Sequence, residues 1–585
     1  MSRVRLAVLF LLVFPGLLEA AEASPWTVED VILAESASDF QISPDGKFVV
    51  WVKSQMDRDK GERVKHLIRT SLTDNRETEL TRGEHSCTWP RWSPDGKYLA
   101  FLSDRPGPKK KDPGKSRAAP RLTWRARGLH HAVPRRTRDE EEEENRTQLW
   151  LLDPTGGEPW QLTELKRDIT AIAWLDAGTL LFTAQEEPTL REQLLKEGKK
   201  DTSIVVDDDP NEPPVRLFKI EVKSRKITRL SANLDRIQSF RVSPDGRYVV
   251  AIHARSLRFV YDNQIRPVTL LHDLKAGTSR EILDARLNPQ EIRWQPDSRG
   301  FFFTAAYTTH PRYLMAYVTR LHHHDLASGK TREVNLDWER GLADQNEHDG
   351  RAGIVVLGDG FLALLADGVR HRLARFSPDR DGWKRQFVTS QHAGNIFGFQ
   401  LSKDGKTLVY AHSTAATPTQ WYRARLEGAR IVDPVAITKL NEDLQEKPRA
   451  KTEIIRWKGA LDEEVEGILY YPHGWTKGKK YPLVLMIHGG PFGADFDAWE
   501  ESWAYPANLL AQKGAFVFKP NYHGSSNYGL KWAESIANGK YYDLPCLDLE
   551  KGVDFLIAQG LVDPARLGTM GWSNGAILSV ALIAR

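Results

Sequence analysis

One four-residue phrase recurs along much of the chain, and it constrains the fold more than any other feature. Ser-Pro-Asp-Gly begins at Ser43, Ser93 and Ser243, and an apolar run follows each copy at once. Proline fixes the first turn position, aspartate bonds the local backbone and glycine takes a positive φ, so each phrase predicts a tight turn that leads into a strand. Turns that recur at such intervals indicate a repeat architecture.

Four weaker copies fill the gaps between these phrases. Each has a turn signal before an apolar run, and they lie at 174–178, 294–298, 358–360 and 402–405. Seven copies predict seven blades, so we expect a seven-bladed β-propeller over residues 36–446. The same interpretation predicts that the tryptophans of the repeats do not point into solvent; these are Trp92, Trp174 and Trp294.

Two polar segments interrupt the repeats. Residues 106–144 contain a basic run followed by a run of acidic residues, and residues 186–214 contain three consecutive aspartates. Few apolar side chains are available for burial in either segment, so we interpret both as solvated excursions from the blades. A peptide-binding or oligomerisation arm is the alternative for the first segment.

After about residue 451 the repeats give way to strands that alternate with helices. A hairpin is expected from 453–458 and 465–471, and further strands at 483–487, 515–519 and 567–570. Helical segments are expected at 499–513 and at 547–559, where Asp548 would open the helix. Apolar strands separated by helices predict a parallel sheet covered on both faces, so we expect an α/β-hydrolase domain over residues 451–585.

A G-x-S-x-G motif near the end of the chain stands between an apolar strand and an apolar helix, at Gly571-Trp572-Ser573-Asn574-Gly575. In this context it is a nucleophile elbow, in which a strained turn exposes the serine hydroxyl and the glycines Gly571 and Gly575 relieve crowding. Upstream, an apolar run ends in His488-Gly489-Gly490-Pro491, the pattern from which this fold takes oxyanion-hole amides. The two motifs together predict Ser573 as the catalytic nucleophile.

Further motifs give the chain a family resemblance. They are Tyr481-Pro482, His488–Pro491, Asn521–Gly529, Asp563–Gly568 and Gly571–Gly575. With them the chain resembles the serine peptidases of the prolyl oligopeptidase family, especially the acylaminoacyl-peptidase and dipeptidyl-peptidase branches. Two positions depart from the family pattern. Asn521-Tyr522-His523 stands where Asn-Pro-Arg is usual, and Asn574-Gly575-Ala576 where Tyr-Gly-Gly is common.

The resemblance implies a mechanism and a substrate class. Ser573 would attack the carbonyl of a short peptide in an acyl transfer, and the oxyanion would be stabilised by backbone amides of Asn574 and of Gly489 or Gly490. The propeller would cap the hydrolase domain and exclude folded proteins. His488 is then either a weak alternative donor or a packing residue. An acidic pair at 186–187 either binds a substrate amine or opens a solvated helix.

The acid and base partners of Ser573 are not found downstream of it. In this fold the triad runs Ser, Asp, His along the chain, but the twelve residues after Ser573 contain no Asp, Glu or His. We therefore expect a hydrolase domain that is truncated after the elbow and a chain that is inactive as it stands. An esterase on the same sheet and a non-catalytic propeller scaffold stay open as alternatives.

Charge and cysteine content exclude several classes of partner. Lys and Arg number 82 against 78 Asp and Glu, so no long-range field would recruit nucleic acid or an anionic membrane. The two cysteines, Cys87 and Cys546, fall in different predicted domains, which argues against a disulfide and against a zinc site. We expect no metal, no cofactor and no nucleic-acid or membrane partner.

The N-terminus has the order of a secretory signal. Arg3 and Arg5 precede an apolar run from Leu6 to Leu18, and small residues follow up to Ala23. A membrane anchor is the alternative, but the run contains Pro15 and is shorter than the roughly 20 residues needed to span a bilayer. We expect a signal peptide at 1–23 and a secreted or periplasmic protein.

Overall fold

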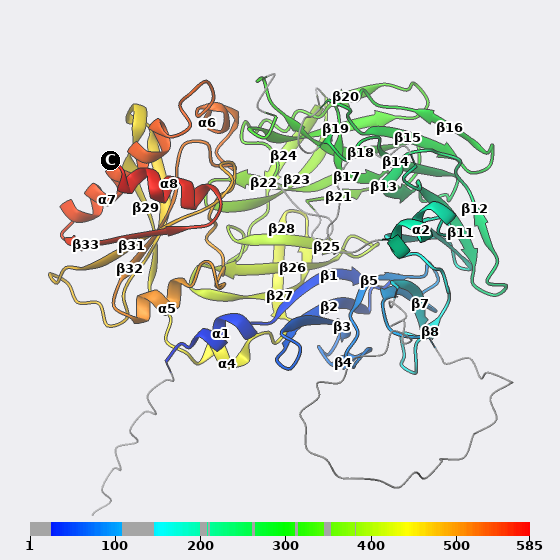
Figure 1. The fold of residues 1–585 in the computed structure, drawn as a ribbon, viewed down its shortest axis with the longest axis horizontal. Coiled ribbons are helices and arrows are strands. Elements are labelled where there is room, and N and C mark those ends of the chain that lie inside the picture. The colour runs from blue at the N-terminus through cyan, green and yellow to red at the C-terminus, as the bar shows by residue number, and fades with distance from the viewer. Residues whose placement is uncertain are drawn as a thin grey trace, which may run out of the picture.

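The computed structural model describes eight stretches of the chain: residues 25–107, 146–198, 208, 211–259, 264–310, 314–343, 353–380 and 382–585. The predicted signal peptide at 1–23, nearly all of the first polar insertion and part of the second lie outside the described residues. Figure 1 shows two halves side by side: sheets arranged like the blades of a propeller, and a single sheet with helices.

Within the described residues, twenty-eight strands make up the propeller-like half. They form five four-stranded antiparallel sheets and one eight-stranded sheet, whose order is β16-β15-β14-β13-β11-β10-β9 with β12 on β11. The first two sheets contain β1 (Ser36–Ile42), β2 (Phe48–Asp57), β3 (Glu62–Ser71), β4 (Glu77–Glu79), β5 (Cys87–Trp92), β6 (Leu99–Ser103), β7 (Gln148–Leu152) and β8 (Trp160–Gln161). The eight-stranded sheet contains β9 (Ala171–Asp176), β10 (Thr179–Gln185), β11 (Val215–Glu221), β12 (Ile227–Arg229), β13 (Arg236–Val242), β14 (Tyr248–Ala254), β15 (Val268–Asp273) and β16 (Thr278–Glu281).

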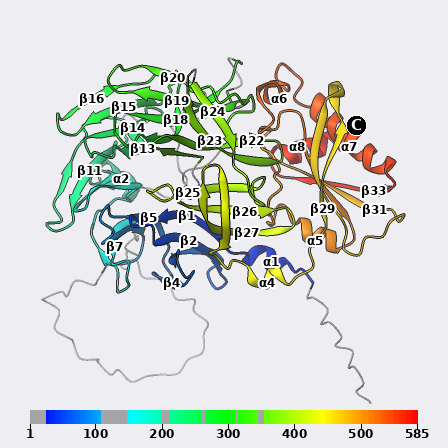
Figure 2. The ribbon, with the colours of Figure 1, turned by 180° about the vertical axis from the view of Figure 1, so that it is seen from behind.

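Three further four-stranded sheets complete the arrangement, which Figure 2 shows from behind. Their strands are β17 (Pro289–Trp294), β18 (Gly300–Tyr307), β19 (Val318–Asp325), β20 (Thr331–Glu333), β21 (Ile354–Leu357), β22 (Gly360–Asp367), β23 (Arg370–Asp379), β24 (Gly382–Phe387), β25 (Ile396–Leu401), β26 (Thr407–Thr414), β27 (Thr417–Glu427) and β28 (Arg430–Ala436). Short helices flank the sheets at α1 (Val28–Leu33), α2 (Leu190–Gly198) and α4 (Glu442–Gln445). The first and last sheets pack together, and Phe40 of β1 stacks on Trp421 of β27 at 3.7 Å between ring centroids.

The recurrent phrase forms the predicted turn. Ser43 Oγ donates to the Asp45 carboxylate (2.7 Å) and accepts from the Phe48 N–H (3.0 Å), which closes the turn at the start of β2. Gly46 has a φ of 71°, the left-handed conformation for which glycine was expected. The same two bonds of a serine hydroxyl recur at Ser93, Ser243 and Ser402.

The three tryptophans of the repeats join neighbouring sheets. Each is half-buried, and its indole N–H donates to a backbone carbonyl on the first strand of the preceding group of four. Trp92 donates to Gln41 O (3.0 Å), Trp174 to Arg91 O (2.9 Å) and Trp294 to Arg241 O (3.3 Å). The side chains are therefore not scattered on the solvent face, because the tryptophan of each repeat is hydrogen-bonded to the preceding group of strands.

The second half is one mixed sheet of order β29-β30-β32-β31-β33. Its strands are β29 (Thr452–Lys458), β30 (Glu464–Tyr470), β31 (Tyr481–Ile487), β32 (Phe516–Asn521) and β33 (Val562–Gly571). The predicted hairpin is present as β29 and β30, and β30 also runs antiparallel to β32. The predicted strands that helices separate run parallel, as β32, β31 and β33, and only β30 runs against the others in this sheet of the described residues.

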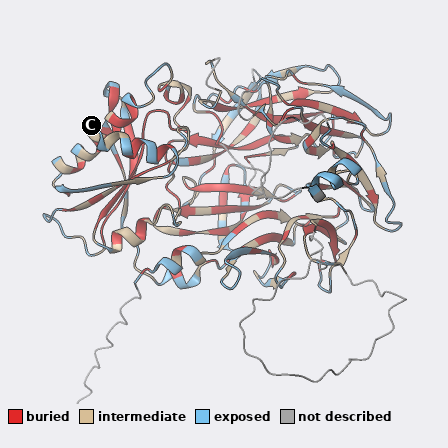
Figure 3. Cartoon of the chain, viewed as in Figure 1, coloured by how far each residue is buried: buried red, intermediate tan, exposed pale blue. Residues whose placement is uncertain are grey.

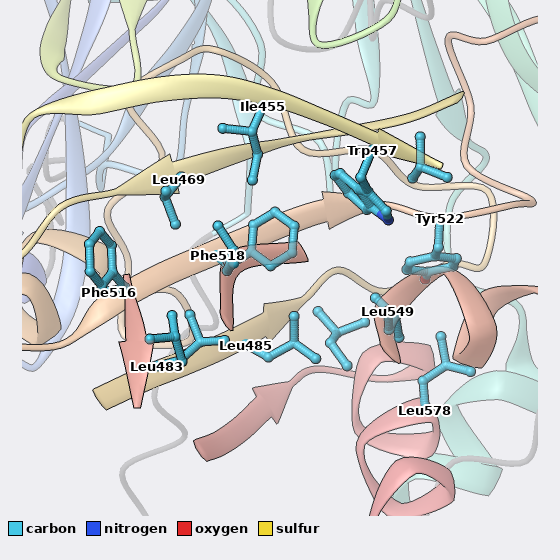
Figure 4. Close-up of a cluster of buried hydrophobic side chains, with 14 of the residues drawn as sticks. Ile455, Trp457, Leu469, Leu483, Leu485, Phe516, Phe518, Tyr522, Leu549 and Leu578 are labelled. Atoms are coloured by element: carbon cyan, nitrogen blue, oxygen red, sulfur yellow. The ribbon is translucent and has the colours of Figure 1, made fainter. Parts of the chain in front are cut away.

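Both faces of this sheet are covered. On one face Leu469, Phe518 and Leu485 pack against the helices α7 (Asp543–Ala558) and α8 (Asn574–Ile583), as Figure 4 shows. The other face packs on α5 (Ala507–Gln512) and on two residues of the propeller-like half, Val369 and Ala415. Figure 3 shows that buried residues follow the strands of both halves. Among the described residues, no helix has both the length and the apolar character that a membrane crossing requires.

Two helices differ from their predicted extents. The segment 499–513 is helical only from Ala507, because Pro506 precedes that residue and the carboxylates of Glu500 and Glu501 are bonded to Lys519 and Asn508 in a loop. The helix expected at 547–559 begins four residues earlier, at Asp543. Asp548 lies inside it and accepts from Ala460 N–H (2.7 Å), so it does not cap the helix.

A turn of the propeller-like half is inserted into the second half, the hydrolase half that contains β29 to β33. Between β22 and β23, Gly368 N–H donates to Asn527 O (3.0 Å) and Val369 N–H donates to Glu466 Oε1 (2.8 Å). Val369 O accepts from Asp497 N–H (2.8 Å), and Asn527 Nδ2 donates to the carbonyls of Gly368 and Arg370. The peptide groups of this turn are thus satisfied by the other half.

We predict that Gly368→Ala loosens the contact between the two halves. Gly368 has a φ of 67°, and a Cβ there would lie 2.0 Å from Glu466 Oε1. The variant is expected to unfold more easily by about 1–3 kcal/mol, measured by calorimetry. Gly428→Ala is the matched control, because its φ is 61° and nothing lies within 4 Å of a Cβ there. Equal losses in the two variants would show that only backbone strain was measured.

Candidate active site

The predicted nucleophile lies on a strained turn between β33 and α8. Ser573 has φ 54° and ψ −118°, a conformation that side-chain-bearing residues rarely adopt, and its side chain is exposed. Such strain persists only where the surrounding structure fixes it. The elbow geometry expected from the motif is therefore present, and it presents the hydroxyl to solvent.

The two glycines of the elbow are required by close backbone contact. A Cβ on Gly571 would lie 2.5 Å from the Gly575 carbonyl carbon, and one on Gly575 would lie 2.0 Å from Ile487 O. Neither contact involves a side chain that could move aside. The end of β31 therefore passes so close to the elbow that only glycine fits at both positions.

Gly489 of the H-G-G motif lies beside Ser573. A Cβ on Gly489 would lie 2.9 Å from Trp572 O and 3.4 Å from Ser573 Cβ. Gly490 has a φ of 131° and turns the chain sharply toward Phe492. Asn574 is the first residue of α8, so its N–H has no acceptor within the helix. The structure thus brings Ser573, Asn574 and Gly489 together, and Gly490 follows as the turn.

His488 is a packing residue in this structure. Its side chain is buried, Nε2 lies 2.9 Å from Ser525 Oγ, and Nδ1 lies 2.8 Å from Gly489 O. The imidazole stacks on Tyr522 at 4.3 Å, and burial lowers the pKa of His488. Both ring nitrogens are engaged, which favours the packing role over that of an oxyanion donor.

A hydrogen-bonded chain behind the elbow was missed from the sequence. The Asn574 side chain is 2% exposed; its Nδ2 donates to Tyr522 Oη (3.0 Å), and its Oδ1 accepts from the Tyr541 hydroxyl. Tyr522 in turn donates to His488 O (2.9 Å). The two tyrosines lie 33 and 52 residues before Asn574 along the chain, and of these two the sequence drew attention only to Tyr522, within the unusual Asn521-Tyr522-His523.

His523, which stands at the position of the family arginine, is buried between two carboxylates. Its Nδ1 lies 2.7 Å from Asp548 Oδ2 and its Nε2 lies 3.2 Å from Glu463 Oε2. Trp532 stacks on the ring at 3.9 Å. These contacts occupy both ring nitrogens, so His523 is not oriented toward Ser573. Within the part of the chain that the structure describes, no side chain is hydrogen-bonded to Ser573 Oγ.

The acidic pair at 186–187 does not form an amine site. Glu186 Oε1 accepts from Arg229 Nη1 (2.8 Å), and Glu186 Oε2 is bonded to Arg216. The neighbouring Glu187 lies 3.5 Å from Lys166 Nζ. Cations of the protein therefore already neutralise both carboxylates.

The loop that contains Trp503 lies against Trp572 of the elbow. Trp503 is 69% and Trp572 57% exposed, and their rings meet edge to face at 5.2 Å. Behind them Lys519 is buried with Asp495 (2.9 Å) and Glu500 (2.7 Å). Burial alone would lower the pKa of Lys519, but these two carboxylates raise it well above its usual value.

Metal-binding chemistry has no candidate among the described residues, because no three His, Cys, Asp or Glu side chains there are arranged to hold an ion. Cys87 and Cys546 are both free and buried, as expected for small apolar side chains.

Residues 501–585 match the model of the prolyl oligopeptidase family. Among curated proteins, the uncharacterized peptidase YuxL of Bacillus subtilis is 22% identical, over 94% of this chain and 79% of that protein. Dipeptidyl-peptidase 5 of Porphyromonas endodontalis is 23% identical, over 95% and 75%. Among solved structures, the acylaminoacyl peptidase of Pyrococcus horikoshii has a TM-score of 0.66 at 17% identity, over 95% and 76%. A puromycin-hydrolyzing peptidase of Mycobacterium tuberculosis has a TM-score of 0.63 at 15% identity, over 95% and 76%. These structures share the fold.

We predict that Gly575→Ala disrupts the elbow. Its Cβ would overlap the backbone at Ile487, so the variant is expected to lose about 1–3 kcal/mol or more of stability in denaturant titrations. Gly568→Ala, on the same strand as Gly571, is the control, because its nearest neighbour would lie 3.8 Å away. Equal stability of the two variants would contradict the close contact.

A second prediction concerns pH. Burial raises the pKa of Glu501 from 4.5 to about 7, against hydrogen bonds from Asn508. Between these values the folded state binds a proton that the unfolded chain has released. The stability from this group is therefore complete below about pH 4.5 and is lost as the pH rises through about 7. Between about pH 5 and 7, the melting temperature of Glu501→Gln should fall less than that of the wild type, because glutamine does not titrate.

The exposed Glu158→Gln variant is the control for this pH series and should follow the wild-type curve. Curves of Glu501→Gln and wild type that run parallel across this range would contradict the assignment.

Proposed function

The chain belongs to the prolyl oligopeptidase family, and from this premise we propose that it is a serine peptidase that acts on short peptides through Ser573. The observation that carries the proposal is the strained Ser573 turn beside Gly489, with the free helix-start amide of Asn574 next to it. A nucleophile beside two backbone donors is one part of what acyl transfer requires.

The reaction follows from this arrangement. Ser573 Oγ attacks the peptide carbonyl carbon, and the charge that develops on the carbonyl oxygen is stabilised by the N–H groups of Asn574 and Gly489. The C–N bond then breaks, the amine leaves with a proton, and water hydrolyses the ester to regenerate the hydroxyl. The exposed pair of Trp503 and Trp572 offers an apolar surface to the substrate next to the nucleophile.

Turnover also needs a base that accepts the Ser573 proton. The described residues place none in hydrogen-bond contact with Ser573 Oγ, and loss of triad members costs on the order of 10^4- to 10^6-fold in rate. The proposal therefore includes slow reaction by the chain on its own. The same observation favours a second candidate, a non-catalytic scaffold of the same fold.

The propeller-like half is proposed to have seven blades. Seven turn phrases support this number, as does the eight-stranded sheet, in which two antiparallel groups of four strands are joined by one parallel pair, Val215 with Arg236. A propeller in this position would limit entry to short peptides. The rate of cleavage should then fall steeply with substrate length, and equal cleavage of a folded protein would contradict the role.

Export is a further part of the proposal. It rests on the order of charged, apolar and small residues in 1–23. N-terminal sequencing of the exported protein should give a start between Ala21 and Pro25, whereas a start at Met1 would contradict cleavage.

We predict that a fluorophosphonate probe labels Ser573 slowly, because no base contacts its hydroxyl within the described residues, and that Ser573→Ala abolishes this labelling even after prolonged incubation, as read by peptide mass mapping. Ser535→Ala, whose hydroxyl bonds Trp532 O in α6 (Leu530–Glu534), is the control and should label like the wild type. Labelling of another serine, or none, would contradict a nucleophilic role. Peptide-amide hydrolysis that persists in Ser573→Ala would exclude Ser573 as the residue responsible, and a labelled protein that cleaves aryl esters alone would favour an esterase.

A further inference from the structure

The hydroxyl of Tyr522 joins the two backbone segments that carry the proposed oxyanion donors. It donates to His488 O (2.9 Å), at the end of β31, and accepts from Asn574 Nδ2 (3.0 Å), at the start of α8. We propose that Tyr522 is a positioning residue that sets the relative orientation of the Gly489 and Asn574 amides. This inference rests on the proposed function, because it deepens the role of the same site.

The bond to His488 O acts directly on the first donor. The carbonyl of His488 and the N–H of Gly489 belong to one planar peptide group, in which they point in opposite directions. Fixing the carbonyl therefore fixes the direction of the Gly489 N–H. No side-chain atom of Gly489 exists that could do this instead.

The bond from Asn574 acts on the second donor. The Asn574 side chain is held from both ends, by Tyr522 at Nδ2 and by Tyr541 at Oδ1. Its backbone N–H is the first of α8 and has no partner within the helix to orient it. An anchored side chain on the same residue supplies that orientation, next to the strained Ser573.

Tyr522 itself has little freedom to move. Its side chain is fully buried, its ring stacks on His488 with planes 13° apart, and its carbonyl accepts from Trp532 Nε1 (3.0 Å) and Ser525 Oγ (2.7 Å). Burial also raises the pKa of Tyr522, so the hydroxyl keeps its proton and can donate at neutral pH. The rigid Tyr522 side chain thus links the backbone segments at Gly489 and at Asn574.

The test compares Tyr522→Phe with wild type in the reaction with the fluorophosphonate, whose phosphoryl oxygen takes the oxyanion position. We expect the saturating rate constant of Ser573 modification to fall about tenfold or more, with the half-saturating probe concentration unchanged. Tyr481→Phe is the matched control, because Tyr481 is a buried tyrosine of β31 whose hydroxyl contacts Thr476 N and Oγ1 at 3.0 Å. It should react like the wild type.

Hydrogen exchange gives a readout that does not need reactivity. Amides in 488–493 and 573–577 should exchange faster in Tyr522→Phe and be unchanged in Tyr481→Phe. Wild-type exchange in either segment would overturn the proposal, as would faster exchange with a wild-type rate of modification. An unreactive wild-type Ser573 would contradict the proposed peptidase, and exchange would still decide whether Tyr522 joins the two segments.

Tyr541→Phe provides a second test of the proposal in case Tyr522→Phe does not fold. It removes only the outer bond to Asn574 Oδ1, from a half-buried tyrosine. A smaller fall in rate, in the same direction and without a change in half-saturation, would support the proposal. A wild-type rate in a Tyr541→Phe variant would overturn the role assigned to the Asn574 side chain.

Discussion

The close passage of β31 beneath the elbow is the constraint on which the hydrolase half depends. Parallel pairing places Ile487 opposite Gly571, and Ile487 O lies so near Gly575 that no side chain fits between them. The same register carries the chain from Ile487 into the glycines that border Ser573. The register of β31 and β33, the two elbow glycines and the position of Gly489 therefore depend on one another, and a change in any of them displaces the others.

The propeller-like half also supports this geometry, because two of its residues complete the core of the hydrolase half. Val369 and Ala415 cover the face of the sheet that α5 leaves open. The peptide groups of the turn before Arg370 are hydrogen-bonded to Asn527, Glu466 and Asp497. Asp497 and Asn527 follow the H-G-G and Asn521-Tyr522-His523 motifs closely along the chain, and Glu466 pairs with Asn521 across the sheet. The two halves thus meet through buried polar contacts close to the site, as well as through their surfaces.

Local chemistry made part of this fold predictable from the sequence. The Ser43 turn and the Ser573 elbow depend on residues only a few positions apart, so their motifs specify their geometry. The lengths of α5 and α7, the antiparallel pairing of β30 and the Tyr522 hydroxyl depend on partners that are distant along the chain. Asp548 shows the difference: its place in the sequence resembles a helix cap, yet its carboxylate bonds Ala460 and His523 across the domain.

The backbone of Ser573 has a thermodynamic consequence. A serine at φ 54° and ψ −118° costs roughly 1–3 kcal/mol relative to a relaxed turn, while glycine adopts positive φ at little cost. The residue that stability alone would select at this position is therefore the one without a hydroxyl. Stability and the reactivity proposed for Ser573 are opposed at this single residue, so sequences selected only for thermal resistance would lose the serine at the elbow.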